Sequence, residues 1–176
     1  GGTVLTQNLI IGDRAGTTGS ASGTVNLNSG GTLLAQEIQA GAGTATRVIN
    51  WNDGTIGNYA DGQDMTISGV QIRLAGTGTH AFQVNGVDAV ATVNAVMSNA
   101  AGSAGTLTKE GNGTLVLAAN NSYSGATTVN NGTLAVNGSI INSAVTVNNG
   151  GILGGSGMVN SVSVANGGVC LLYTSP

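Results

Sequence analysis

Residues 105–136 read GTLTKEGNGTLVLAANNSYSGATTVNNGTLAV, and this stretch contains a phrase that recurs along the chain. Three successive copies of GTL, or its variant GIL, begin at positions 113, 132 and 151, and these three are equally spaced. Short runs with the pattern Val-x-Val or Leu-x-Val accompany these copies, and a period of two is typical of a strand with one buried face. Recurrence at a fixed interval of this length predicts a solenoid built from short repeated units.

A second phrase recurs at a slightly shorter interval and supports the same fold. Residues 145–152 (VTVNNGGI) match residues 162–169 (VSVANGGV), and residues 25–33 (VNLNSGGTL) carry a related phrase far upstream. Asn-Gly between alternating runs is also a strong hairpin signal, so a hairpin fold is the alternative. The runs are short for hairpins, and residues such as Asn149 and Asn166 recur one interval apart, where a solenoid stacks them about 4.8 Å from each other. We therefore expect an all-β parallel β-helix of about nine coils, each with about 17–21 residues.

The composition excludes several classes of protein. Gly, Ala, Thr and Asn account for 93 of the 176 residues, and only 6% of the residues are charged. The net charge of −3 and the 40% hydrophobic content do not fit a disordered chain, and the apolar runs are too short for a membrane span. A nucleic-acid binder needs a basic patch, whereas the four cations are widely spaced: Arg14, Arg47, Arg73 and Lys109.

The middle of the chain, residues 36–103, is less regular than the last third. Residues 67–74 alternate and predict one strand. In residues 87–97 four valines recur at intervals of three, which fits a helix face, but the β-branched content favours strands. Asn, Asp and Gly gather in residues 51–63, where we expect loops that leave the solenoid wall.

The last seven residues, CLLYTSP at 170–176, differ abruptly in composition and contain the single Cys and the single Pro. They resemble the translation of a transposon adapter used in sequencing libraries, and we expect them to be an artefact of that origin. On this interpretation Cys170 has no catalytic or redox role. Because residue 1 is Gly rather than Met, we also expect the chain to be a fragment of a longer protein.

Residues 105–136 resemble the autotransporter-associated β-strand repeat, also called the passenger-associated transport repeat. The match is close to residue for residue, although Ser122 and Ser124 stand where the family has Thr, and Ala126 stands where it has Gly. Residues 143–169 are similar to the phrases that follow this repeat in the family. The resemblance predicts a less regular β-helical segment at 1–104 and the repeats at 105–169, ahead of the adapter-like end at 170–176.

The resemblance implies a right-handed parallel β-helix in the secreted passenger of a type V autotransporter of a Gram-negative bacterium. It also implies export through a C-terminal outer-membrane β-barrel of the same polypeptide and display at the cell surface. We expect a β-helical stem or adhesin scaffold whose coil stacking assists export, with a host receptor or a glycan as its candidate ligand. We expect no enzymatic activity, no cofactor, no metal, no nucleic-acid partner and no transmembrane segment in this part of the chain.

A carbohydrate-active β-helix enzyme, a polysaccharide lyase or hydrolase, is the alternative function. Asp53, Asp61 and Asp64 are close in sequence, and Arg73 follows at the distance of one coil. Attack on a glycan needs paired carboxylates near a base. Asn-Asp-Gly and Asp-Gly are also ordinary turn sequences, and we expect the turn role. The other acidic residues are Asp13, Glu37, Asp88 and Glu110.

The remaining signals are weaker. His80 is the only His, so we expect no transition-metal cluster. Trp51 and Tyr59 could contact a receptor or a glycan, but we expect them to fill the side of a coil. A flat Thr array that binds ice or a mineral is a third alternative, which we disfavour because we do not expect the Thr residues to share one position of the coil.

Overall fold

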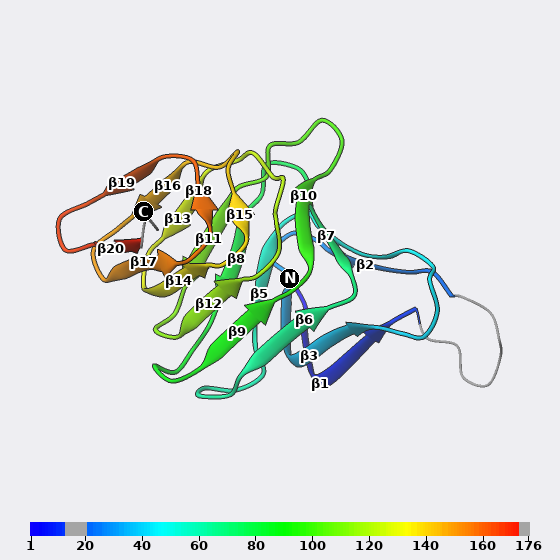
Figure 1. Ribbon diagram of the computed structural model, residues 1–176. Coiled ribbons are helices and arrows are strands. Elements are labelled where there is room, and N and C mark those ends of the chain that lie inside the picture. The colour runs from blue at the N-terminus through cyan, green and yellow to red at the C-terminus, as the bar shows by residue number, and fades with distance from the viewer. Residues whose placement is uncertain (13–20, 173–176) are drawn as a thin grey trace.

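The computed structural model describes residues 1–12 and 21–172, and these residues form a parallel β-helix (Figure 1). Strands that lie far apart in sequence pair with one another in parallel, and the described residues contain no helix. The all-β parallel β-helix predicted from the repeats is therefore confirmed. The hairpin alternative is wrong, because hairpin neighbours pair antiparallel.

The strands line three faces of the coil. Two long strands, β1 (Thr3–Ile11) and β3 (Thr32–Ala40), bend across faces 1 and 2, so that β3 joins both faces into one 14-stranded sheet. Face 1 continues with β5 (Gly54–Asn58), β8 (His80–Gln83), β11 (Leu107–Glu110), β13 (Thr127–Val129), β16 (Val145–Val147) and β19 (Val162–Val164). Face 2 continues with β6 (Met65–Ser68), β9 (Val90–Val93), β12 (Thr114–Leu117), β14 (Gly132–Val136), β17 (Gly151–Gly155) and β20 (Val169–Leu172).

Face 3 closes the coil with shorter sheets. A four-stranded sheet contains β2 (Gly23–Leu27), β4 (Arg47–Trp51), β7 (Gln71–Leu74) and β10 (Val96–Asn99). Later coils place β15 (Ser139–Ile140) and β18 (Met158–Val159) on this side, and a bridge between Asn120 and Ser139 leads to them. The described strands thus complete seven turns of the helix and begin an eighth.

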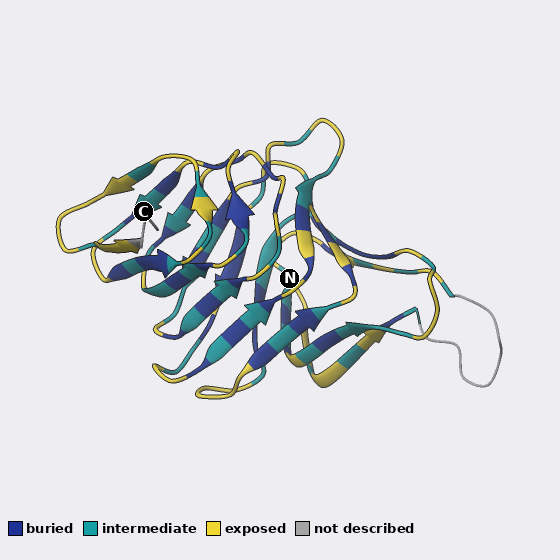
Figure 2. Ribbon diagram, in the orientation of Figure 1, coloured by how far each residue is buried: buried dark blue, intermediate teal, exposed yellow. Residues whose placement is uncertain are grey.

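Apolar side chains at matching heights of consecutive coils form columns in the interior, and Figure 2 shows that buried residues recur on the strands of successive coils. On face 2 one column runs through the buried residues Ile38, Ile67, Val93, Leu117 and Val136, each in register with the next. Such short strands are not stable alone, so burial of these columns between neighbouring coils supplies their stability.

The coil lengths correct part of the prediction. From Leu107 onward the coils on face 1 have the predicted length of about 17–21 residues, because Leu107 pairs with Thr127, Thr127 with Val145 and Val145 with Val162. The earlier coils are longer, since Thr3 pairs with Thr32 and Thr55 with Ala81. The predicted coil length of about 17–21 residues is therefore wrong for the earlier coils, and the described strands complete fewer turns than the predicted nine or so. The earlier coils carry longer loops and the two nine-residue strands β1 and β3.

The phrase Asn-x-Gly-Gly, with Ala at its first position in the last copy, forms the same tight corner at three places. Gly31, Gly151 and Gly168 each donate a backbone hydrogen bond to the carbonyl three positions earlier, at 2.8–3.0 Å. The glycine before each of them has a positive φ, between 65° and 87°. The upstream copy joins face 3 to face 1, whereas the two downstream copies join face 1 to face 2. The phrase therefore encodes the geometry of a corner but not its place in the coil.

Three local predictions have mixed outcomes. Residues 87–97 form strand segments and no helix, as we favoured. Residues 67–74 do not form one strand, because Gly69 turns the chain at φ 67° from β6 on face 2 to β7 on face 3. Within residues 51–63, only the segment from position 59 leaves the wall as a longer loop, since residues 54–58 are β5.

Polar side chains form ladders on the outside of the coil. The Asn148 amide donates to Asn130 at 2.7 Å, and the Asn130 amide donates to the Glu110 carboxylate at 2.5 Å. Shorter ladders join Asn50 to Asn26 and Asn52 to Asn28 on another side. We expected such a ladder from the recurrence of Asn149. The observed ladder instead uses the preceding residue, Asn148.

A substitution at Gly132 tests whether the coil corner requires glycine. Gly132 has φ 64°, and a Cβ there would meet the carbonyl oxygens of Gly113 and Gly111 at 2.4 and 2.6 Å. We expect Gly132→Ala to lower the free energy of unfolding by about 1–3 kcal/mol, measured by urea denaturation.

Gly154→Ala is the matched control, because a Cβ there has its nearest neighbour at 4.0 Å. We expect it to change the free energy of unfolding by no more than about 0.5 kcal/mol. Equal effects of the two substitutions would show that close approach at the corner does not govern stability.

Candidate functional site

The predicted acidic residues lie at separate places on the β-helix. Asp53 is at the corner between β4 and β5, whereas Asp61 and Asp64 are in the loop between β5 and β6. Strand β5 separates the two positions by about 17 Å of extended chain. Arg73 lies on face 3, in register with Asn50. The structure therefore does not bring Asp53 together with the other three residues.

Asp53 has the turn role that its sequence context predicts. Its carboxylate accepts backbone hydrogen bonds from Thr79 at 2.9 Å, from Gly54 at 2.8 Å and from Gly30 at 3.2 Å. These hydrogen bonds favour the ionised form and lower the pKa of the carboxyl group, with the bond from Thr79 as the largest cause. Asp53 thus ties three consecutive coils together at one corner.

The aromatic candidates are mainly internal. Trp51 is fully buried, donates its indole N–H to the carbonyl of Gly54 at 3.1 Å and packs edge-on against His80 and Phe82. The His80 Nε2 lies 2.8 Å from the Trp51 carbonyl oxygen and 3.1 Å from that of Ala75. Tyr59 is half-buried in the β5–β6 loop. Trp51 therefore fills the coil, as expected, and is not available to a ligand.

Other sequence-derived candidates can be placed briefly. Asp13 and Arg14, like residues 173–176 of the adapter-like end, lie outside the described residues. Cys170 lies on the exposed terminal strand β20. Among the described residues no group of three or more His, Cys, Asp or Glu side chains could hold a metal ion. The same residues include no helix long and apolar enough to cross a membrane.

Three buried polar side chains, those of Arg47, Asn58 and Lys109, donate hydrogen bonds to the carbonyl oxygens of coil corners. The Asn58 amide donates to the carbonyls of Ala60, Gln63 and Asn85. The Arg47 guanidinium donates to carbonyls of the loop between β3 and β4, those of Ala42, Gly43 and Ala45. Backbone carbonyls that turn out of the strand ladder need such donors, because an unpaired buried carbonyl is costly.

Lys109 is the most unusual of these residues. It occupies a position in an interior column between Phe82 and Val129 and is completely buried. Its ammonium group donates to the carbonyls of Glu110 and Gly111 at 2.8 Å and to that of Asn131, one coil further, at 3.2 Å. Desolvation lowers the pKa of Lys109 to about 8. The lysine thus joins two successive corners from inside, opposite the outer bond between Asn130 and Glu110.

A hydroxyl network fills the interior where the chain enters β13. The Tyr123 and Thr127 hydroxyls are 2.8 Å apart, Thr127 is 2.8 Å from the Ser143 hydroxyl, and Ser143 donates to the Gly125 carbonyl at 2.7 Å. Burial raises the pKa of Tyr123 to about 12. Sequence analysis missed the internal roles of Lys109 and Tyr123. The available signal for Lys109 was its alternation with Leu107, which places both residues on the inner side of β11.

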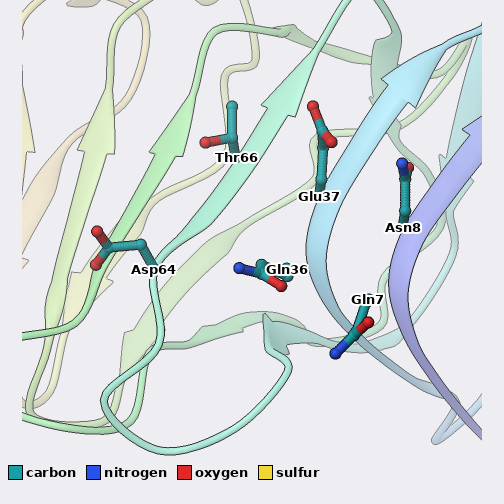
Figure 3. A pocket seen from close by; sticks show the side chains of 6 residues that line it. All are labelled: Gln7, Asn8, Gln36, Glu37, Asp64 and Thr66. Atoms are coloured by element: carbon teal, nitrogen blue, oxygen red, sulfur yellow. The ribbon is translucent and has the colours of Figure 1, made fainter.

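A polar groove lies on the outer surface where faces 1 and 2 meet (Figure 3). It has a volume of about 470 Å³. Its floor comes from β1 and β3, and its far side comes from the β5–β6 loop and β6. Six side chains line it: Gln7, Asn8, Gln36, Glu37, Asp64 and Thr66. Sequence analysis did not identify the groove, because these residues come from three coils of unequal length.

Thr residues do share a position of the coil, contrary to our expectation. An outward column on face 1 contains Thr3, Thr32, Thr55, Ala81, Thr108, Thr128, Thr146 and Ser163. The next outward column is mixed and includes Gly57, Gln83 and Glu110. The array is one column wide and is interrupted by Ala81, so it lacks the second dimension that recognition of a crystal surface needs.

Comparison with known proteins finds similarity to one family. The model of the passenger-associated-transport-repeat matches residues 107–136, which confirms the resemblance predicted from the sequence. These residues run from β11 to β14 and include Lys109, Tyr123 and Gly132. No curated protein and no solved structure matches the chain. The repeat associates the chain with the passenger of an autotransporter.

Replacement of Lys109 tests its role as a corner donor. We expect Lys109→Met, which has a similar length, to lower the free energy of unfolding by about 1–3 kcal/mol, because three corner carbonyls lose a donor. Urea denaturation at pH 7 measures the effect. Thr108→Ala, on the outer side of the same strand, serves as the control and should stay within about 0.5 kcal/mol of the wild type. A Lys109→Met variant as stable as the wild type would contradict this role.

The pH dependence of stability provides a second test. The pKa of Lys109 is about 8 in the folded protein and 10.5 when unperturbed, so between these values the unfolded state binds more protons and stability rises with pH. The pKa of Tyr123 is about 12 when folded and 10.0 when unperturbed, so stability falls above pH 10. We expect a maximum of the unfolding free energy near pH 10, and we expect the rise above pH 8 to disappear in Lys109→Met.

Proposed function

We propose that the chain is part of a secreted autotransporter passenger, acts as a β-helical stem or adhesin scaffold at the bacterial cell surface, and assists its own export by stacking coil on coil. One observation carries this proposal. The family repeat at 107–136 occupies two consecutive coils that pair in register with the coils before and after them. The repeat is therefore a continuous part of the solenoid, with a paired coil on each side of it.

The physical basis is templated growth. Outside the cell no ATP is available, so the free energy of folding must oppose backward movement of the chain through the pore. In a solenoid each coil contacts only its neighbours, so stability accumulates coil by coil. The Lys109 bonds inside the coil and the Asn130–Glu110 bond outside it attach the second coil of the repeat to the first at one corner. Such attachments oppose loss of the most recently added coil.

The proposal includes a partner and a location. The passenger-associated repeat supports a translocator in the same polypeptide, for which we propose a C-terminal outer-membrane β-barrel in a Gram-negative cell. It also supports secretion to the cell surface, where the rod would hold further passenger segments or its own loops away from the membrane. We assign no catalytic role, because Asp53 lies at another corner than Asp61 and Asp64 and is engaged in backbone hydrogen bonds.

An export assay separates the contribution of the repeat from general stability. The chain would be fused to a C-terminal outer-membrane translocator and expressed in a Gram-negative host, and the surface-exposed fraction would be measured by protease accessibility on intact cells. We expect Gly132→Ala, within the repeat, to reduce this fraction several-fold, because a coil corner in the stacking unit is strained.

The matched variant is Gly54→Ala, which places the same substitution at a positive-φ corner outside the repeat. Gly54 has φ 101°, and a Cβ there would meet the Gly31 carbonyl oxygen at 2.1 Å. We expect this variant to be exported more efficiently than Gly132→Ala. Wild-type export of both variants would contradict the role of coil stacking, and equal loss in both would assign the effect to overall stability.

A further inference from the structure

We propose that the groove between β1, β3 and the β5–β6 loop binds a neutral, hydroxyl-rich oligosaccharide. The inference goes beyond the passenger role, since it assigns a ligand class to a surface outside the family repeat, which begins at position 107. It rests on the chemistry of the lining side chains, on their hydrogen-bonding state and on the way in which the coils create the groove.

The groove exists because consecutive coils change path at one corner. In β1 and β3 the chain passes from face 1 to face 2 as a continuous bent strand, in which Gln7 and Asn8 lie beside Gln36 and Glu37. In the following coil the chain leaves the wall between β5 and β6. Asp64, at the end of this loop, lines the groove on the side opposite β1 and β3 (Figure 3). The floor is thus paired sheet, which suits a preformed site.

The lining consists of carboxamides, carboxylates and one hydroxyl. Among the described residues the side chains of Gln7, Gln36, Glu37 and Thr66 have no hydrogen-bond partner. Asn8 uses its carbonyl oxygen to accept from Gln39 at 3.3 Å, and Asp64 uses one oxygen to accept from the Val90 backbone at 2.8 Å. Unpartnered amide N–H groups and carboxylate oxygens are the complementary donors and acceptors for sugar hydroxyls.

The charge of the lining argues against other ligand classes. Glu37 and Asp64 are acidic, and the lining formed by the described residues contains no cation, so phosphates, nucleic acids and acidic glycans would be repelled. The same lining residues include no large apolar side chain, which removes the basis for binding a lipid or an apolar peptide. A cationic peptide is the alternative that the experiment tests. It would pair with the two carboxylates but would not need the hydrogen bonds that the three carboxamides offer.

The size and spacing of the groove fit a short stretch of a sugar chain. The volume of about 470 Å³ lies within the range of about 300–1,000 Å³ that is usual for small-ligand sites. Asn8, Glu37 and Thr66 are in register on three adjacent strands, so their polar groups repeat about every 4.8 Å across the floor. An extended ligand lying across the strands can therefore contact successive side chains.

Binding would be tested with the full chain and neutral oligosaccharides of glucose, galactose and mannose, beside sialylated and glucosamine oligomers and a short oligolysine peptide. Saturation-transfer NMR would identify ligands and titration would give the affinity. We expect a neutral oligosaccharide to bind with little dependence on salt. We expect Gln36→Ala and Glu37→Ala each to weaken its binding by about tenfold, the effect of losing one or two polar contacts.

Gln83→Ala is the matched control, because Gln83 is an exposed glutamine on face 1 outside the groove, and it should leave the affinity unchanged. Thermal unfolding would establish that all three variants are folded. The proposal is overturned if no neutral oligosaccharide binds, if acidic oligomers, glucosamine oligomers or oligolysine bind better, or if the groove variants bind like the wild type. Each of these results would leave the export assay unaffected, so the two proposals fail separately.

Discussion

The in-register parallel pairing of each coil with the next is the constraint on which the rest of this structure depends. It fixes the position of each strand residue along the coil, so paired residues on neighbouring coils bring their side chains into contact even where their sizes or polarities do not match. The interior must therefore be compatible column by column, as in the run from Ile38 to Val136, and outside positions become ladders where Asn or Glu recur. The same constraint brings corners into close contact, which is why a Cβ at Gly132 would collide with the corner of the preceding coil.

Corners are also where parallel pairing fails, because carbonyl groups turn away from the ladder. At three corners, inward-pointing polar side chains donate to several carbonyls at once: Arg47, Asn58 and Lys109. Burial of a charge is normally unfavourable, and the lowered pKa of Lys109 reflects that cost. The alternative, three corner carbonyls without donors, is also costly. The buried Lys109 is therefore a structural residue that connects two coil corners.

The sequence predicts the C-terminal coils well because there the repeat in the sequence and the repeat in space coincide. Gly132 and Gly151 begin successive copies of one phrase and are paired partners at one corner of the coil. In the earlier coils the structural repeat continues, but no sequence repeat of the same length accompanies it. Loop length can change without changing the strand register, so residues 67–74 alternate like one strand and yet turn a corner at Gly69. For the same reason the groove could not be predicted, because Asn8 and Glu37 are paired partners at a spacing that matches no repeated phrase in the sequence.

The difference between the two parts of the chain has a functional consequence. Short, uniform coils minimise the loop entropy lost for each strand formed, which suits the coil-by-coil folding that we propose for export. Longer coils lose more entropy, but they are the ones that can raise a loop beside a flat bend and so create a polar groove. The same β-helix thus contains short, uniform coils in the repeat and longer, less uniform coils before it. The stability of the stacked coils allows the earlier coils to have longer loops, and the groove that we propose as a sugar-binding site lies among those longer coils.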